Sequence, residues 1–230
     1  MHAKLSLVAS ARNRKGEAQP AASAYPTLAR RLAETTRQLV LTRSLLANKQ
    51  RECEELAHSL AHDAHSDVLT GLFNRRKFNH LCATEIERSV RYGTPLALIM
   101  VDIDHFKRVN DEYGHLVGDR ALVEVARVLG EQTRASDALC RWGGEEFMIL
   151  APHLDMASAV QVANKLRTAV AEADFGFAGP LTCSFGVATL RDRDRTVDLI
   201  LRADSCLYRA KRSGRNCVAM QTDGEGATTV

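Results

Sequence analysis

Apolar and polar positions alternate with two different periods over residues 66–230, and together they predict a mixed fold. Residues 96–101 (LALIMV) form a continuous apolar run followed by acidic residues, which is typical of a buried central strand. Residues 118–133 repeat their apolar positions with helical spacing. Residues 138–152 are predicted to form two strands joined at Gly143 and Gly144, because a Gly-Gly pair supplies the positive φ angles of a two-residue hairpin turn.

The remaining apolar stretches extend this alternation to residue 220. They predict helices over residues 155–173 and 196–212, and strands over residues 181–189 and 216–220. The resulting order is β-α-β-β-α-β with a further helix and strand. This order predicts an α/β (α+β) sandwich in which helices flank a central, mostly antiparallel sheet.

The amino-terminal part has a different pattern. Residues 1–26 have no apolar period and are expected to be a flexible leader, and residues 221–230 a flexible tail. Residues 27–65 are expected to form a helical stalk with a heptad seam, which favours a coiled coil over a single amphipathic helix lying on its own domain. Thr35, Thr42 and Lys49 interrupt the seam. Its apolar positions are Leu28, Leu32, Leu39, Leu46, Cys53, Leu56 and Leu60.

Composition and charge narrow the class of protein. The chain has 230 residues, of which 45% are hydrophobic, and its six cysteines include no Cys-x-x-Cys pair, so we expect a cytoplasmic protein without a disulfide framework. No apolar stretch is long enough for a membrane span. The net charge of +3 includes no dense basic stripe, so we expect no nucleic-acid binding.

Three histidines near the end of the predicted stalk share one helix face. His58, His62 and His65 follow each other at spacings of four and three residues. Neutral imidazoles at this spacing can bind zinc, but solvated surface histidines have the same pattern. Both interpretations remain open from the residues.

Four acidic residues lie where two of the predicted strands end. Asp102 and Asp104 follow the apolar run, and Glu145 and Glu146 begin the returning strand of the hairpin. If the two strands are neighbours, carboxylates from both converge over one small volume. Carboxylate oxygens are the ligands that Mg²⁺ prefers, and Mn²⁺ accepts them too. The pattern therefore predicts a phosphoryl- or nucleotidyl-transfer site with two such ions.

Five segments, in order, give the chain a strong resemblance to one family. Residues 66–220 resemble the GGDEF-domain family, the diguanylate cyclases, in its GGEEF variant. The resemblance implies a fold like that of nucleotidyl cyclases and polymerase palms, and the joining of two GTP molecules into cyclic di-GMP with release of two pyrophosphates. The segments are DVLTGLFNRR (67–76), DIDHFKRVNDEYGHLVGD (102–119), RWGGEEF (141–147), SFGVA (184–188) and ADSCLYRAKRSGRN (203–216).

The resemblance also assigns roles to individual residues of this chain. It implies that Asp102, the Ile103 main-chain carbonyl and Glu145 hold the metal ions, and that Glu145, Glu146 and Lys107 are catalytic. Asn110 and Asp119 match the pair that reads guanine, and a site built for guanine leaves polar groups unsatisfied with ATP. The other implied substrate-binding residues are Phe106, His115, Gly143, Gly144, Lys211 and Arg215.

The family's inhibitory product site has a counterpart in the Arg-x-x-Asp pair of Arg134 and Asp137, which ends shortly before the Gly-Gly pair. The resemblance implies that cyclic di-GMP binds there and inhibits. Secondary contacts could come from Arg88, Arg91, Lys165 and Arg167.

The implied reaction needs a homodimer, because each domain binds one GTP and two domains must face each other. The stalk and the catalytic domains would both contribute to it. Two other classes remain: an inert GTP or cyclic di-GMP receptor of the same fold, and a structural dimerisation protein.

Overall fold

The structure, a computed structural model, describes residues 24–63, 65–222 and 227–229 and divides into two compact units, Met1–His58 and Ser59–Val230. Helix α1 (Ala24–Asp63) makes up the described part of the first unit and continues for five residues beyond it, which confirms the predicted amino-terminal helix. The expected leader lies almost entirely outside the described residues. The side chains of residues 53–64 do too, so the zinc hypothesis for His58, His62 and His65 stays a prediction.

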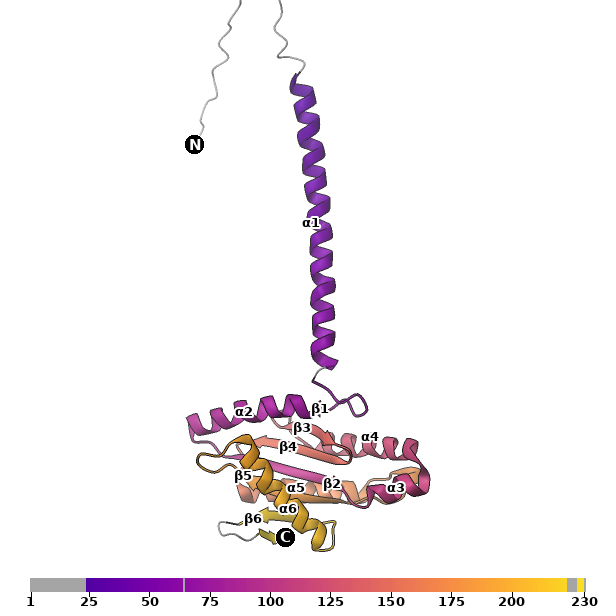
Figure 1. Cartoon of the computed structure of the whole chain (residues 1–230), viewed down its shortest axis with the longest axis vertical. Coiled ribbons are helices and arrows are strands. Elements are labelled where there is room, and N and C mark those ends of the chain that lie inside the picture. The colour runs from indigo at the N-terminus through magenta and orange to yellow at the C-terminus, as the bar shows by residue number, and fades with distance from the viewer. Residues whose placement is uncertain (1–23, 64, 223–226, 230) are drawn as a thin grey trace, which may run out of the picture. The chain divides into compact units, whose positions relative to one another are not determined.

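The described strands form one seven-stranded sheet in the order β1-β3-β4-β2-β5-β6-β7 (Figure 1). Four of its six pairings are antiparallel, and only β1 with β3 and β5 with β6 are parallel, so the predicted mostly antiparallel sheet is confirmed. The strands are β1 (Phe73–Asn74), β2 (Leu96–Ile103), β3 (Ala138–Gly143), β4 (Glu146–Pro152), β5 (Cys183–Thr189), β6 (Val218–Gln221) and β7 (Ala227–Thr229). Strand β7 lies within the segment that was expected to be a flexible tail, and it pairs with β6.

Helices cover both faces of this sheet. The helices of this unit are α2 (Arg75–Tyr92), α3 (Phe106–Tyr113), α4 (His115–Gln132), α5 (Met156–Glu172) and α6 (Thr196–Arg212), with a short 3-10 turn, η2 (Gly176–Ala178). One core cluster joins α3, α4 and α5 to the sheet face that carries Ile99 and Val101. A second joins α2 and α6 to the opposite face, which carries Leu98 and Met100. The predicted helix-flanked sandwich is therefore confirmed.

Strand β2 is the centre of the unit. It pairs with β4 on one side and β5 on the other, and all of its residues are buried. This confirms the central strand predicted from the apolar run at 96–101. Because successive side chains of a strand point to opposite faces, Asp102 continues the face shared with α2 and α6, while Ile103 continues the other.

The hairpin turn lies one residue later than the sequence pattern predicted. Gly143 is the last residue of β3, and the pairing register shifts between Arg141 and Gly143. Trp142 is the extra residue of this bulge. Gly143 therefore pairs with Glu146, and Gly144 and Glu145 form the turn. Gly144 has a φ of 49°, a left-handed conformation that glycine adopts without steric cost, whereas Gly143 does not have a positive φ.

Among the described residues, no helix is both long and apolar enough to cross a membrane. The side chains of five of the six cysteines are described, and all five are free thiols.

Candidate active site

The acidic residues converge where β2 and β4 lie side by side. Asp102 and Glu146 are directly opposed in the antiparallel ladder, so their side chains share the sheet face covered by α6. The Ile103 amide donates to the Glu145 main-chain carbonyl at 3.3 Å, which continues the pairing into the turn. The expected convergence of carboxylates from two separated segments is therefore present in the structure.

Asp102, Glu145 and Glu146 form what we call the acidic group. Lys211 of α6 places a positive charge beside it. Its Nζ atom lies 2.7 Å from Asp102 Oδ2, and the Asp102 side chain is only 6% exposed. Burial raises the pKa of Asp102, while the hydrogen bond and charge of Lys211 act in the opposite direction. Burying a carboxylate charge without a partner costs free energy, so Asp102 requires a cation beside it in the folded protein.

Burial and the charge of Asp102 both affect the pKa values of Glu145 and Glu146. Burial raises the pKa of Glu145, and the negative charge of Asp102 adds to the effect. Burial and the same neighbouring charge raise the pKa of Glu146. Three carboxylates thus repel one another over a small volume, and a bound cation would relieve that repulsion.

Asp104 has a different role from the one its position beside Asp102 suggested. It is 5% exposed and accepts hydrogen bonds from Ser184 Oγ at 2.6 Å and Thr182 Oγ1 at 2.7 Å. The Asn216 amide donates a third, at 3.0 Å. Both carboxylate oxygens are therefore engaged within the protein, and Asp104 links the ends of β2 and β5 to the loop after α6.

That loop carries Arg215, one of the two expected phosphate-binding cations. Arg215 and Asn216 have φ angles of 66° and 44°, a left-handed conformation that is uncommon for residues other than glycine. The Arg215 amide donates to the Ala210 carbonyl at 3.1 Å, and Arg167 Nη1 donates to Asn216 Oδ1 at 3.1 Å. These bonds and the one to Asp104 fix the loop. Burial raises the pKa of Asp102, and the charge of Arg215, like that of Lys211, acts against this rise. Lys211 and Arg215 therefore both act electrostatically on the acidic group.

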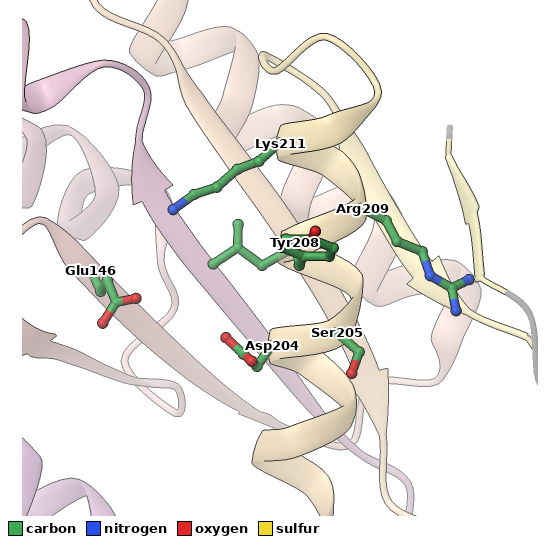
Figure 2. Close-up of a pocket in the computed structure, with 7 residues that line it drawn as sticks. Glu146, Asp204, Ser205, Tyr208, Arg209 and Lys211 are labelled. Carbon is green, nitrogen blue, oxygen red and sulfur yellow. The ribbon is translucent and has the colours of Figure 1, made fainter.

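A cleft of about 440 Å³ runs along α6 beside the acidic group (Figure 2). Lys211 and Asp204 point from α6 toward the strand that carries Glu146, while Arg209 points away from it (Figure 2). The lining of the cleft combines charged side chains with Leu207 and Tyr208, and it meets the acidic group at Glu146 and Lys211.

The residues expected to read guanine lie on the helix pair α3 and α4. Asn110 is half-buried near the end of α3, and Asp119 and His115 are exposed in the first turns of α4. Lys107 is exposed in the first turn of α3, and Phe106 is 5% exposed and belongs to the core. The structure thus places the base-reading candidates on helices, and the acidic candidates on the strands β2 and β4 or in the turns next to them.

An arginine that sequence reasoning did not assign supports the hairpin turn. Arg141 donates to the Gly144 carbonyl through Nε at 3.0 Å and Nη2 at 2.8 Å. Its Nη1 atom also donates to Asp67 Oδ1 at 3.1 Å, and Asp67 accepts from the Thr70 amide and hydroxyl. The segment after α1 is thereby tied to the turn that carries Glu145. The available signal was an arginine two residues before the Gly-Gly pair in the RWGGEEF segment.

The expected product-binding pair forms a turn between α4 and β3. The Arg134 amide donates to Asp137 Oδ2 at 3.2 Å, and the Asp137 amide donates to the Arg134 carbonyl at 3.0 Å. Arg134 is exposed. The aspartate thus shapes the turn that displays the arginine.

The acidic group does not include a conventional closed metal cage. Among the residues that the structure describes, no group of three or more His, Cys, Asp and Glu side chains has the geometry of a metal site. Mg²⁺ often takes only one or two carboxylates from the protein and its other ligands from phosphate and water, and such a site contains no group of this kind.

Comparison with known proteins places this geometry in a family. The sequence matches the family described as "Diguanylate cyclase, GGDEF domain" over residues 64–217. It is 38% identical to diguanylate cyclase DgcM of Escherichia coli strain K12 over 167 residues, which cover 73% of this chain and 41% of DgcM. The chain thus spans about two-fifths of that relative's length.

Solved structures agree with the sequence comparison. One is the coiled coil and GGDEF domain of DgcB from Caulobacter crescentus in complex with c-di-GMP, with 30% identity, a TM-score of 0.71, and coverage of 85% of this chain and all of that one. Another is diguanylate cyclase SiaD from Pseudomonas aeruginosa in complex with its activator SiaC, with 36% identity, a TM-score of 0.66, and coverage of 85% and 76%. This chain therefore belongs to the GGDEF-domain family of diguanylate cyclases.

Proposed function

We propose that this protein is an active diguanylate cyclase of the GGEEF type, which condenses two GTP molecules into cyclic di-GMP and releases two pyrophosphates. The observation that carries the proposal is the opposition of Asp102 and Glu146 across β2 and β4, with Lys211 against Asp102. This arrangement gathers negative charge that invites cations, next to a cationic pair suited to a triphosphate.

The donor set fits a divalent cation. Asp102, the Ile103 main-chain carbonyl and Glu145 would hold two ions per site, Mg²⁺ or Mn²⁺, through hard oxygen ligands. The crowding of the carboxylates supports this, because burial and the charge of Asp102 raise the pKa values of Glu145 and Glu146, and a divalent cation would offset that charge. When bound, such ions lower the pKa of a ribose 3′-hydroxyl and offset the charge of the phosphates.

The side chains around this group would bind and orient the triphosphate. Lys211 and Arg215 would hold the phosphates from the side of α6, the lysine as a point charge and the arginine through paired hydrogen bonds. Lys107, exposed in the first turn of α3, would offset the charge that grows on the phosphates in the transition state. Glu145 would assist removal of the proton from the attacking 3′-hydroxyl.

The base would be read by α3 and α4. The Asp119 carboxylate would accept from guanine N1–H and N2–H, and the Asn110 amide would donate to O6 or N7. Adenine has neither N1–H nor an N2 amino group, so Asp119 would remain unsatisfied with ATP. Adenine also carries an amino donor in place of O6, so Asn110 could not donate at that position. Phe106, His115, Gly143 and Gly144 complete the proposed substrate-binding set.

The reaction requires two such domains, and the α1 helix would bring them together as a homodimer. The described seam leucines, among them Leu32, Leu39 and Leu46, are 68–69% exposed. Pairing with a second copy would remove this apolar stripe from water and raise the effective concentration of the domains to roughly the millimolar range. We expect removal of residues 28–62 to cut activity sharply at nanomolar protein and to spare GTP binding. Equal specific activity with and without these residues would contradict this role of α1.

Product inhibition would act through Arg134 and Asp137. The exposed guanidinium of Arg134 suits the phosphates and guanine edges of cyclic di-GMP. We expect Arg134→Ala to raise the product concentration needed for half-inhibition at least about tenfold. Inhibition unchanged in this variant would place the inhibitory site elsewhere.

The experiment that tests the proposed activity is incubation of the full chain with GTP and Mg²⁺, with chromatographic separation and mass spectrometry of the products. We expect cyclic di-GMP and pyrophosphate in a ratio of one to two, and no product from Glu145→Gln. No product at any protein concentration, with product binding that Arg134→Ala abolishes, would instead identify a receptor.

A further inference from the structure

Gly118 of α4 lies directly beneath the side chain of Asn110. A Cβ atom built on Gly118 would be 1.9 Å from Asn110 Oδ1 and 3.0 Å from Asn110 Cγ. It would also lie 3.3 Å from Phe106 Cζ. Real Cβ atoms do not approach other atoms to 1.9 Å, so the present position of the Asn110 amide requires a residue without a side chain at 118.

The backbone at this position does not itself need glycine. Gly118 lies inside α4 and its φ is not positive, unlike Gly114 at the start of that helix. Glycine in a helix interior is unfavourable relative to alanine because it loses more conformational freedom on folding. Gly118 therefore makes α4 less stable, and the space that it leaves is filled by Asn110.

We propose that Gly118 is a positioning residue that supports guanine binding by holding the Asn110 amide in place. The inference rests on the proposed function of Asn110 as a base-reading group. Asp119, the other proposed base-reading group, is the next residue in α4. The contact between Gly118 and Asn110 therefore fixes the amide of α3 relative to the helix turn that carries the carboxylate. A fixed spacing is what two hydrogen-bonding groups need to match one base edge.

Close packing of α3 on α4 is the alternative reason for a glycine at this position. The two explanations differ in what must move. The obstructing Asn110 oxygen is at the end of a side chain with rotatable bonds, so a methyl group at 118 can be accommodated by turning that side chain away. The Phe106 ring, with Cζ 3.3 Å from the new methyl group, need move only a few tenths of an ångström, so the helices can keep their positions. The main cost then falls on nucleotide binding rather than on folding.

The test measures binding of 3′-deoxy-GTP, which lacks the attacking hydroxyl, to the full chain by calorimetry with Mg²⁺ present. Gly118→Ala should weaken binding about tenfold, the loss expected for one misplaced hydrogen-bonding group, and should raise the melting temperature. Gly130→Ala is the matched control in the same helix, because a Cβ there would meet only Leu139 Cδ2, at 3.9 Å. It should raise the melting temperature similarly and leave binding unchanged.

A double-variant comparison separates the two explanations. Asn110→Ala removes the group that obstructs the methyl, so Gly118→Ala added to it should cause no further loss of binding. The inference would be overturned if Gly118→Ala weakened binding by the same factor in the Asn110→Ala background as in the wild type. Unchanged binding in Gly118→Ala alone would also overturn it. The wild-type protein reports on the proposed function separately: absence of cyclic di-GMP from GTP would refute the activity, whereas binding of 3′-deoxy-GTP would still test Gly118.

Discussion

The two ends of the proposed substrate site are built in different ways. The acidic end lies at the end of a central strand: Asp102 in β2 and Asp104 just after it are 4% and 5% exposed, and both are held by hydrogen bonds or an ion pair. The base-reading end lies on two helices, where Asp119 and His115 are exposed and Asn110 is half-buried. Buried charges have to be compensated in the folded protein itself, so the acidic end is formed before any substrate arrives.

Substitutions at the two ends should therefore affect different steps of the reaction. A change at the acidic end removes a compensated charge from a crowded group, so it should act mainly on the chemical step. A change at the base-reading end removes one contact from a more open surface, so it should act mainly on affinity and selectivity.

Asp102→Asn should give the largest loss of activity. The variant removes the charge that faces Glu146 and pairs with Lys211, and we expect cyclic di-GMP production to fall about a thousandfold. Initial rates of pyrophosphate release at saturating GTP measure this. Glu131→Gln, which neutralises an exposed carboxylate on α4, is the control and should keep full activity. A loss smaller than tenfold in Asp102→Asn would break the distinction between the two ends.

Arg141→Lys should show that the acidic end depends on support from outside it. A lysine cannot donate to the Gly144 carbonyl and to Asp67 in the same fork geometry. The turn carrying Glu145 would be less well fixed, and we expect kcat to fall about thirtyfold with little change in KM. Arg127→Lys on the surface of α4 serves as the control. A rise in KM at unchanged kcat would assign Arg141 to substrate binding instead.

Asp119→Asn should act on selectivity. The carboxylate is proposed to accept from N1–H and N2–H of guanine, and inosine triphosphate lacks the N2 amino group. The variant should therefore bind GTP about tenfold more weakly and lose part of its preference for GTP over inosine triphosphate. The ratio of kcat/KM for the two nucleotides measures this. An unchanged ratio would show that Asp119 does not read the amino group.

Asp67→Asn should have the smallest effect, on the pH dependence of stability. Hydrogen bonds from Thr70 and Arg141 outweigh burial and lower the pKa of Asp67. A carboxyl group whose pKa is lower in the folded state contributes stability above its unfolded pKa, and this is lost as the pH falls through the folded value. The wild type should therefore lose more melting temperature than the variant below about pH 4. Parallel melting curves across this range would contradict it.

The sequence pattern was sufficient for the parts of the fold that depend on local periodicity. The apolar run at 96–101 identified the central strand, and the spacing over 196–212 identified α6 with its bounds. Helix α2 was not predicted, because its buried positions Phe78, Cys82 and Ile86 lie among many charged residues. The hairpin turn was displaced by one residue because a bulge cannot be recognised from a Gly-Gly pair alone.

The acidic group was predictable for the same reason as the strands that carry it, whereas its supports were not. Asp104 contacts Ser184 and Asn216, which are 80 and 112 residues away along the chain. Arg141 contacts Asp67 across 74 residues. Such contacts depend on the arrangement of the whole sheet, and no local pattern distinguishes Asp104, with its donors, from Asp102, with its single ammonium partner.

The most direct measurement of the central claim is the anomalous X-ray scattering of Mn²⁺ in crystals of this protein grown with 3′-deoxy-GTP. The account predicts anomalous peaks between the triphosphate and the side chains of Asp102 and Glu145. Manganese bound elsewhere, or a nucleotide bound away from β2 and the hairpin turn, would contradict it.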